Sequence, residues 1–398
     1  MKFMKFMKFM KVAIVSFGHI DSIISIAKYT SIYSDITLFL IFSQFSKSTS
    51  IVSFDDVKVE NGFVKDEIVK NEILTDQIKE YVGAEFKIKV FVYDNLKLRS
   101  IKNFILSNSL VNTLKKYDII HINGQHGVLP QLQLLLLGKK VVYTIHDFIG
   151  HSGERKRFPE LMNKWTLYLG SQIILQNTET YNEVIKKFPS VRNKIHFIPF
   201  GPLEIYTKFG NQNLKTHKNT IILFGRISPY KGIEYLVEAA KLVRNTIPNL
   251  KVIIAGSGRF YFDIEPIRGN NTFRIINRYI SNNELADLIR ESEIVVCSYT
   301  DATQSGVVMT AYAFNKPVIA SAVGGFLDAV KHNKTGLLVP PRDSKALAEA
   351  IIKLLKNPDK LKEMSNNISN LSKDSEFSWE SIAKKTAAVY KMALGKKE

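Results

Sequence analysis

The segment FGRISPYKG, residues 224–232, stands between an apolar run, Thr220–Phe224, and an amphipathic pattern, Gly232–Ile247. A buried strand followed by a glycine turn and a helix is typical of the repeating unit of parallel α/β sheets. Arg226 and Lys231 would project from the turn beside the start of the helix. Two cations at a helix N-terminus suit a diphosphate, because they can neutralise charge on a leaving phosphate. The alternative is a turn with two solvated cations.

Two further loops follow strands in the same half of the chain. Gly256-Ser257-Gly258 comes directly after Leu250–Ala255, and the missing side chains would let a nucleotide approach the backbone. A tight turn explains these glycines nearly as well. Farther on, DATQSG (301–306) leads into a helix at Val307, so that backbone N–H groups would face a phosphate in the loop. An ordinary serine-capped helix start is the alternative.

The same alternation of strand and helix runs through the chain and predicts an α/β fold of two Rossmann-like domains. The expected strands of the first half are Lys11–Phe17, Thr37–Phe42, Ile88–Tyr93, Asp118–Ile122, Lys140–Ile145, Ile173–Gln176 and Lys194–Pro199. Those of the second half are Thr220–Phe224, Leu250–Ala255, Ile294–Cys297 and Pro317–Ser321. The expected helices are Asp21–Tyr33, Gly232–Ile247, Asn283–Arg290, Gly306–Phe314, Lys345–Leu355 and Trp379–Leu394.

Breaks in this alternation set the expected domain limits. Residues 1–10 are a Met-Lys-Phe repeat, which we interpret as a tail, and residues 201–219 are rich in glycine and polar residues, as linkers are. We predict an N-terminal domain at 11–200 and a C-terminal domain at 220–375, with a ligand cleft between them. A last helix is expected at 376–398, with Ser378 as its cap and Trp379 as its anchor.

Composition limits the functional class. Of the 398 residues 45% are hydrophobic, which is enough for two cores. The single cysteine, Cys297, excludes an internal disulfide and a cysteine-rich zinc site and favours a reducing, cytoplasmic location. No run approaches the roughly 18 apolar residues of a membrane span. The net charge of +18 attracts polyanions, but the basic residues are dispersed without aromatic stacking partners, so we expect no nucleic-acid partner.

Taken in order, the motifs resemble a known family. The segments FGRISPYKG, GSG, RYISNNELADLIRESEIVVCSY, SGVVMTAYAFNKPVIASAVGG and TGLLVPPRDSKALAEAI resemble the donor half of the retaining glycosyltransferases of family 4, which have the GT-B fold. The resemblance covers Thr220 to about Leu355. It implies that the N-terminal domain, 11–200, binds the acceptor, that the C-terminal domain, 220–375, binds the donor, and that the last helix, 376–398, crosses back to the first domain. The N-terminal half is similar more loosely, through SFGH (16–19), TIHD (144–147) and KIHFIP (194–199).

The resemblance implies a role for each matching residue. Arg226 and Lys231 match the pair that binds the donor diphosphate and would stabilise the departing nucleotide without a metal or cofactor. His146 matches the active-site histidine that lies against the transferred sugar, and these three are the candidate catalytic residues. The candidate donor-binding residues are Gly18, Gly225, Gly256, Gly258, Arg278, Tyr279, Ile280, Gln304, Ser305, Gly306 and Thr310, of which residues 278–280 would pass the nucleobase.

One departure from the family pattern concerns two acidic side chains. Many members carry two glutamates separated by seven residues, one for the sugar and one for the ribose. Counting back from Lys316-Pro317 places Ala302 and Thr310 at those positions. Orientation of the sugar must then depend on other groups, or the chain is a weak or inactive homologue that binds nucleotide sugars or polyanions.

The segment after the first-domain histidine is a candidate acceptor site. DFIGHSGERKR (147–157) contains a glycine loop and the side chains of His151, Glu154 and Arg155, which suit acceptor binding or a mobile lid. A His-Asp pair after a strand, here His146-Asp147, is otherwise often a hydrogen-bonded corner. No hydrolase triad or zinc-ligand spacing is present among these residues.

The sequence therefore predicts transfer of a sugar, with retention, from a nucleotide-diphosphate sugar to a glycan, a lipid-linked molecule or another acceptor. The nucleotide sugar is the substrate, and no cofactor or metal is expected. Association with the inner face of an anionic membrane is a further possibility, suggested by the basic residues Lys139, Lys140, Arg155, Lys156 and Arg157.

Overall fold

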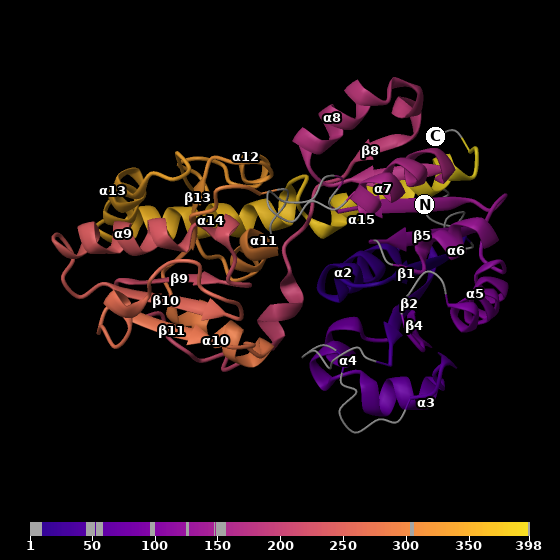
Figure 1. Ribbon diagram of the computed structural model, residues 1–398, viewed down its shortest axis with the longest axis horizontal. Helices are drawn as coiled ribbons and strands as arrows, with labels where there is room; N and C mark the ends of the chain where they lie inside the picture. Colours follow the sequence, from indigo (N-terminus) through magenta and orange to yellow (C-terminus); the bar gives the residue numbers. More distant parts are fainter. Residues whose placement is uncertain are drawn as a thin grey trace. The chain divides into compact units, whose positions relative to one another are not determined.

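The protein is described here from a computed structural model, which covers residues 10–44, 52, 59–95, 100–124, 127–146, 148, 157–302 and 306–396; for 157–159 and 374 only the backbone is described. These residues form two compact units. Unit 1 comprises the described residues up to Phe200 together with those from Trp379 onward. Unit 2 comprises Gly201–Ser378. The chain therefore leaves unit 1, builds unit 2 and returns to unit 1 with its last helix (Figure 1).

Unit 1 is built on an eight-stranded sheet in the order β3-β4-β2-β1-β5-β6-β7-β8. Every neighbouring pair is parallel except β3 and β4, which are antiparallel. The central strands are almost entirely buried because helices cover a parallel sheet on both faces. The strands are β1 (Lys11–Ser16), β2 (Asp35–Ser43), β3 (Gly62–Phe63), β4 (Lys87–Tyr93), β5 (Ile119–Asn123), β6 (Val141–Ile145), β7 (Gln172–Leu175) and β8 (Ile195–Phe197).

The helices of unit 1 divide between the two faces of this sheet. One face packs against α5 (Ile101–Leu114), α6 (Leu129–Leu135), α7 (Arg157–Leu169) and α8 (Thr178–Lys187), whose buried residues share one core with the sheet. The last helix, α15 (Trp379–Ala393), packs on α2 (Ile20–Thr30), β6 and β7. The smaller helices are α3 (Asp66–Ile68), η1 (Val69–Ile73), α4 (Asp76–Val82) and η2 (Pro189–Lys194).

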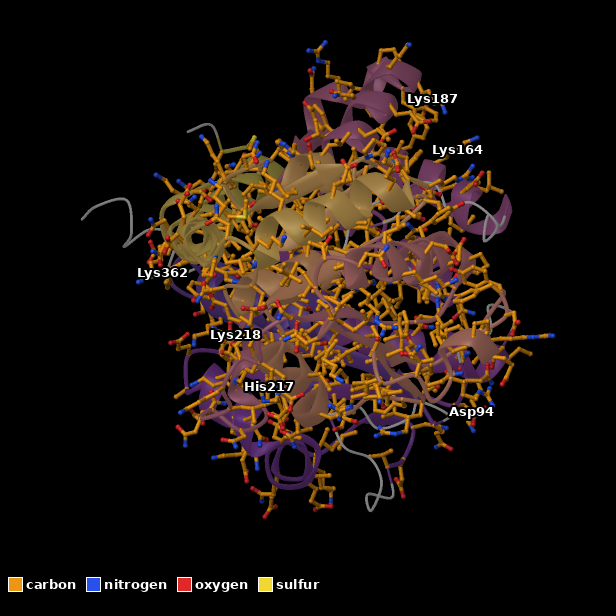
Figure 2. The ribbon with its side chains drawn as sticks, turned by 90° about the vertical axis from the view of Figure 1, so that its left-hand side faces the viewer. Asp94, Lys164, Lys187, His217, Lys218 and Lys362 are labelled. Atoms are coloured by element: carbon orange, nitrogen blue, oxygen red, sulfur yellow. The ribbon has the colours of Figure 1, made fainter. Side chains whose placement is uncertain are left out.

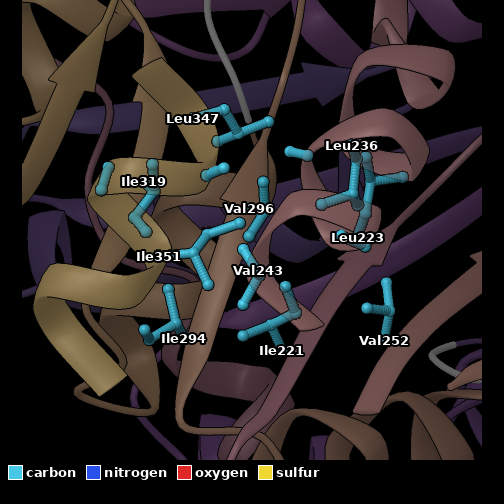
Figure 3. Close-up of a cluster of buried hydrophobic side chains, with 14 of the residues drawn as sticks. Ile221, Leu223, Leu236, Val243, Val252, Ile294, Val296, Ile319, Leu347 and Ile351 are labelled. Atoms are coloured by element: carbon cyan, nitrogen blue, oxygen red, sulfur yellow. The ribbon is translucent and has the colours of Figure 1, made fainter. Parts of the chain in front are cut away.

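Unit 2 is built on a six-stranded parallel sheet in the order β11-β10-β9-β12-β13-β14. Aliphatic side chains of this sheet pack against α9, α13 and α14 to form its core (Figure 3). The strands are β9 (Thr220–Phe224), β10 (Lys251–Gly256), β11 (Phe273–Asn277), β12 (Ile294–Cys297), β13 (Val318–Ser321) and β14 (Gly336–Val339). The helices are η3 (Glu204–Lys208), η4 (Pro229–Lys231), α9 (Ile233–Arg244), η5 (Glu265–Ile267), α10 (Asn282–Glu291), α11 (Gly306–Ala313), α12 (Phe326–Ala329), α13 (Ser344–Leu355) and α14 (Pro358–Asp374).

The predicted fold class, two Rossmann-like α/β sheets, is confirmed, and each predicted strand overlaps a strand of the structure. Residues 201–219 differ from the expected linker. Leu203, Ile205 and Phe209 are buried, and Leu203 N–H donates to the Met309 carbonyl of α11 at 3.1 Å. The stretch packs onto unit 2 through these three apolar side chains, which its glycines and polar residues obscure in the sequence.

Each sheet reverses its strand order at one point. In unit 1 the chain runs outward from β1 to β2 and then continues with β5 on the other side of β1. In unit 2 it runs outward from β9 to β10 and β11 and then continues with β12 on the other side of β9. Ligands of open parallel sheets bind at the carboxyl ends of the strands at such a reversal. The loops after β1 and β5, and those after β9 and β12, are therefore the places to search for a site.

Candidate functional site

The candidate site of unit 2 is centred on the buried side chain of Lys231. It lies at the end of η4, in the loop after β9, and is only 4% exposed. Its Nζ donates a hydrogen bond to the Tyr299 hydroxyl and lies 4.2 Å from the centroid of that ring. Burial, with a smaller contribution from the neighbouring charge of Arg226, lowers the pKa of Lys231 to about 8. The ammonium group is thus poorly solvated, and a bound anion would compensate for the lost water.

Arg226 lies in the same loop, near the ring of a second tyrosine. Its guanidinium carbon is 6.0 Å from the centroid of the Tyr230 ring, and Lys231 Nζ is 5.7 Å from the same centroid. Arg226 is exposed where Lys231 is buried. The loop therefore holds one solvent-accessible and one buried cation around one aromatic ring, an arrangement that favours an anion with several oxygen atoms.

The loop is fixed to the strands beside it by backbone contacts. The Ser298 hydroxyl, directly after β12, donates to the carbonyl oxygens of Lys231 and Gly232 at 3.1 and 2.8 Å. Thr300 N–H donates to the Tyr230 carbonyl at 2.8 Å. These bonds tie the loop after β9 to the loop after β12, so the two loops at the reversal of the sheet form one rigid corner.

The structure explains why glycine occupies three positions of this corner, an explanation that the sequence did not indicate. A Cβ atom on Gly256 would lie 1.9 Å from the Gly225 carbonyl oxygen, and one on Gly258 would lie 2.3 Å from the Ile227 carbonyl oxygen. On the side that a Cβ would occupy, the close approach permitted by Gly256 and Gly258 is therefore that of the neighbouring loop. Gly225 differs, because a Cβ there would lie 3.1 Å from Lys231 Nζ, so its absence keeps room beside the buried cation.

The start of α11 lies next to this corner. The position of a Cβ on Gly225 is 3.8 Å from a methyl group of Val307, the second residue of α11. Gly306 opens the helix, and the hydroxyl of the buried Thr310 donates to the Gly306 carbonyl at 2.7 Å. Ala302 is buried as well, 4% exposed. Gln304 and Ser305 lie outside the described residues.

Arg278, Tyr279 and Ile280 connect β11 to α10 on the edge of the sheet. Arg278 is exposed and makes a two-fold ion pair with Glu284, with nitrogen–oxygen distances of 2.7 and 2.8 Å. This pair raises the pKa of Arg278 and lowers that of Glu284, each through the hydrogen bonds first. Tyr279 is 63% exposed, so its ring is available for stacking on a flat ligand.

Unit 1 gathers polar side chains at the carboxyl ends of its central strands. His146, directly after β6, is buried, and its ring stacks on His19 with centroids 4.1 Å apart. His146 Nε2 is 3.0 Å from Asn123 Oδ1 at the end of β5, so the Nε2–H donates to the amide oxygen. Burial lowers the pKa of His146 well below its usual value, and the neighbouring His19 and His121 lower it further. His146 is therefore a neutral hydrogen-bonding group at physiological pH.

The glycine of the first loop is open to solvent space. A Cβ on Gly18 would meet no atom within 4 Å, and its carbonyl accepts a hydrogen bond from the Ser16 hydroxyl. The left-handed residue of this loop is His19, with φ of 52°, an uncommon conformation for a residue with a side chain. That conformation places the His19 ring against His146.

The remaining candidates of unit 1 lie outside the described residues, namely Asp147, His151, Glu154, Arg155 and Lys156, and the side chain of Arg157 with them. Within the described part of the chain, no group of three His, Cys, Asp or Glu side chains is arranged to hold a metal ion. Cys297 is buried, and burial raises the pKa of its thiol to about 12, so the thiol stays protonated.

Sequence reasoning missed four residues that the structure places at these two positions: His19, Asn123, Tyr230 and Tyr299. His19 and Asn123 do carry a signal, because each lies at or just after the end of a predicted strand, as His146 does. Tyr299 carries none, because it is 68 residues from the lysine that it holds.

Two family models match this chain. The model "Glycosyltransferase Family 4" matches residues 72–201 and "Glycosyl transferases group 1" matches residues 205–371. An uncharacterized glycosyltransferase of Methanocaldococcus jannaschii is 26% identical over 302 residues, which is 70% of this chain and 76% of that protein. D-inositol 3-phosphate glycosyltransferase of Thermobispora bispora is 24% identical over 310 residues, 70% of this chain and 71% of that protein.

A solved structure is similar over almost the whole length. HepE of Anabaena in complex with UDP superimposes with a TM-score of 0.65 at 17% identity, covering 96% of this chain and all of that one. The same protein is also known in complex with UDP-glucose. At this identity the likeness shows the fold, which is the GT-B arrangement of two Rossmann-like sheets.

Proposed function

We propose that this chain, which belongs to the glycosyltransferases with a Family 4 domain followed by a group 1 domain, transfers a sugar from a nucleotide-diphosphate donor bound by unit 2 to an acceptor bound by unit 1. One observation carries the proposal. The buried ammonium group of Lys231 lies at the reversal point of the unit 2 sheet, beside Arg226 and next to a glycine that leaves room for a ligand. UDP in a protein of the same fold supports UDP-sugars as the first donors to test.

In the proposed reaction the bond between the anomeric carbon and the diphosphate oxygen breaks, and its electron pair stays on the diphosphate. Lys231 and Arg226 stabilise that charge as it develops, and an oxocarbenium-like sugar forms. An acceptor hydroxyl then bonds to the anomeric carbon and gives its proton to the departing diphosphate oxygen. We assign retention of configuration from the family resemblance alone.

His146 has a separate role in this proposal. Its neutral ring is fixed by the Asn123 hydrogen bond and the His19 stack, so it contacts the transferred sugar as an oriented polar group and not as an acid. The acceptor class we propose is a glycan or a lipid-linked molecule. Two cations take the part that a metal ion plays in other transferases, so activity should persist in a chelator.

The test begins with a screen of nucleotide sugars for release of nucleoside diphosphate, with and without candidate acceptors. Replacing Lys231 by Ala should lower turnover by about 100-fold or more, because it removes a buried group that stabilises developing charge. The Arg226→Ala, Lys231→Ala double variant should fall further. Lys251→Ala is the matched control, because Lys251 is an exposed cation at the amino end of β10. Full turnover by a folded double variant would refute the proposal.

A second candidate function is donor binding without transfer. Ala302 and Thr310 occupy the positions where many relatives carry glutamates, and the Thr310 hydroxyl is already bonded within α11. In that case a nucleotide sugar would raise the melting temperature of the wild type, by mass action on the folded state, while no diphosphate is released with any acceptor.

A further inference from the structure

Helix α7 carries large apolar side chains on the face directed away from the sheet. Leu161, Trp165 and Tyr168 are 49%, 54% and 57% exposed. They follow one another at intervals of four and three residues and so form one stripe of the helix. Asn163, Thr166 and Leu167, on the opposite side, are buried. A helix of a soluble α/β unit normally presents polar residues to water at these positions.

The stripe continues onto the two neighbouring helices. Gln133 of α6 donates to the Thr166 hydroxyl of α7 at 2.8 Å, and Ser107 of α5 bonds Gln131 of α6 at 3.3 Å, so the three helices lie side by side. Each neighbour also exposes apolar residues. We define the α5–α7 face of unit 1 by its exposed apolar side chains Ile101, Ile105, Leu134, Leu137, Leu161, Trp165 and Tyr168.

Charge on this face has one dominant sign. Exposed lysines border it on all three helices and their ends: Lys115, Lys116, Lys139, Lys140 and Lys164. Lys102 of α5 is paired with Asp94 at 2.7 Å. Lys164 extends outward from α7 (Figure 2). Between residues 100 and 146 the sequence has a single acid, Asp118, and its carboxylate accepts the backbone N–H of Lys11. Glu160 is the one acid among residues 157–178, and it is half-buried at the first turn of α7.

We propose that the α5–α7 face docks on the surface of an anionic lipid bilayer. Tryptophan and tyrosine favour the boundary between headgroups and acyl chains, and leucine and isoleucine enter the acyl region. Lysines beside them keep their ammonium groups at the headgroups and attract anionic lipid. An acidic protein partner would be matched by the lysines alone, whereas a bilayer matches the lysines and the apolar stripe together. The inference stands apart from the transfer reaction, because vesicle binding needs neither donor nor acceptor.

The two tryptophans of the chain make the test direct. Trp165 lies on the α5–α7 face, whereas Trp379 is 2% exposed and stacks on Tyr29 inside unit 1. Vesicles of phosphatidylcholine with about one quarter phosphatidylglycerol should shift the emission of Trp165 to the blue at low salt, and brominated acyl chains should quench it. Vesicles of phosphatidylcholine alone should do neither. The Trp165→Phe variant should bind the anionic vesicles but lose the emission shift, which would assign that shift to Trp165.

Variants separate the two parts of the surface. Lys139→Gln with Lys140→Gln should weaken vesicle binding by about 25-fold, because each lysine near an anionic surface contributes roughly five-fold. Leu137→Ser with Tyr168→Ser should also weaken binding, and the loss should persist at high salt, where the lysine contribution is screened. Lys353→Gln with Lys356→Gln is the matched control, because both are exposed lysines at the end of α13 in unit 2.

Three results would overturn the inference. The first is no binding of the wild type to anionic vesicles at low salt. The second is vesicle binding by both the lysine variant and the apolar variant that is as tight as that of the wild type. The third is a concentration-dependent dimer that Leu137→Ser and Tyr168→Ser dissolve, because a second copy would then cover the face. Release of nucleoside diphosphate from a soluble donor is measured in parallel, so loss of vesicle binding and loss of the proposed activity are distinguishable.

Discussion

At the scale of single residues, the buried cation Lys231 decides what the site can do. A lysine with its Nζ out of water is costly unless partners compensate, and here the Tyr299 hydroxyl and two aromatic rings do so only in part. Its pKa of about 8 is therefore low, chiefly through burial. A donor diphosphate would complete the compensation and raise that pKa again, because it stabilises the charged form.

This pKa leads to a pH prediction. Below about pH 8 the free protein holds Lys231 charged, so the affinity for UDP should be nearly constant. Above it, binding must add the missing proton, and the dissociation constant should rise by up to about ten-fold per pH unit. Calorimetric titration with UDP from neutral to alkaline pH measures this. Lys231→Arg stays charged throughout and should lose the dependence, while an unchanged affinity of the wild type across the range would contradict the assignment.

At the scale of elements, the site depends on how closely two loops approach. The loop after β10 touches the loop after β9 backbone to backbone, and a Cβ on Gly256 would lie 1.9 Å from the Gly225 carbonyl oxygen. Gly256 also has φ of 155°, in the region that favours glycine. The position of the cation loop is therefore set by a glycine outside it.

Gly256→Ala should destabilise unit 2 by about 2 kcal/mol or more, because neither backbone can move without breaking strand pairs. It should also weaken donor binding by displacing Gly225 and Lys231. Gly269→Ala is the control, since its φ of 71° is equally restrictive but no atom lies within 4 Å of the added Cβ. Both tryptophans belong to unit 1, so a transition that far-UV circular dichroism detects and tryptophan fluorescence does not reports the unfolding of unit 2. Equal losses in the two variants would show that the close approach does not matter.

At the scale of the whole molecule, buried hydrogen bonds fix the last helix, α15, to the sheet of unit 1. His121 of β5 has its Nδ1 2.7 Å from the Tyr390 hydroxyl of α15 and its Nε2 2.7 Å from the Thr144 hydroxyl of β6. Burial lowers the pKa of His121 to about 3 and raises that of Tyr390. The imidazole is therefore neutral, and one of its ring nitrogens donates while the other accepts, so both are paired with a hydroxyl.

Tyr390→Phe should destabilise unit 1 by about 1–3 kcal/mol, because it leaves a buried ring nitrogen without its hydrogen-bond partner. Denaturant unfolding followed by tryptophan fluorescence reports unit 1 alone, since Trp165 and Trp379 both belong to it. Tyr312→Phe removes a comparable buried hydroxyl in unit 2. It should leave the midpoint of the tryptophan-detected transition of unit 1 unchanged. A Tyr390→Phe midpoint equal to that of the wild type would mean that packing alone holds α15.

Trp379 behaves as the predicted anchor, because it is buried and stacks on Tyr29 of α2. The Ser378 hydroxyl donates to the Ser375 carbonyl at 2.8 Å. The helix before it, α14, was missed, although Leu361, Met364 and Ile368 form a stripe at helical spacing. Its many charged and amide side chains lower the mean hydropathy, and burial of the stripe against the core is decided only when α13 is in place.

The amino-acid sequence by itself determined the two parallel sheets, the limits of most strands and the cation loop after β9. These depend on short-range patterns, namely apolar runs, helical periodicity and glycine turns, which act before any distant contact forms. The roles assigned to Arg226, Lys231 and His146 remain predictions that the experiments above test.

Only the tertiary structure decided what surrounds those residues. Tyr299 reaches Lys231 across 68 residues, His19 stacks on His146, and the packing of residues 203–209 on α11 turns an expected linker into part of unit 2. The exposure of the apolar stripe of α7 could not be predicted either. The sequence indicates an amphipathic helix but does not show which face packs on the core. Contacts between residues far apart in the chain have no local signal, since they depend on which strands become neighbours.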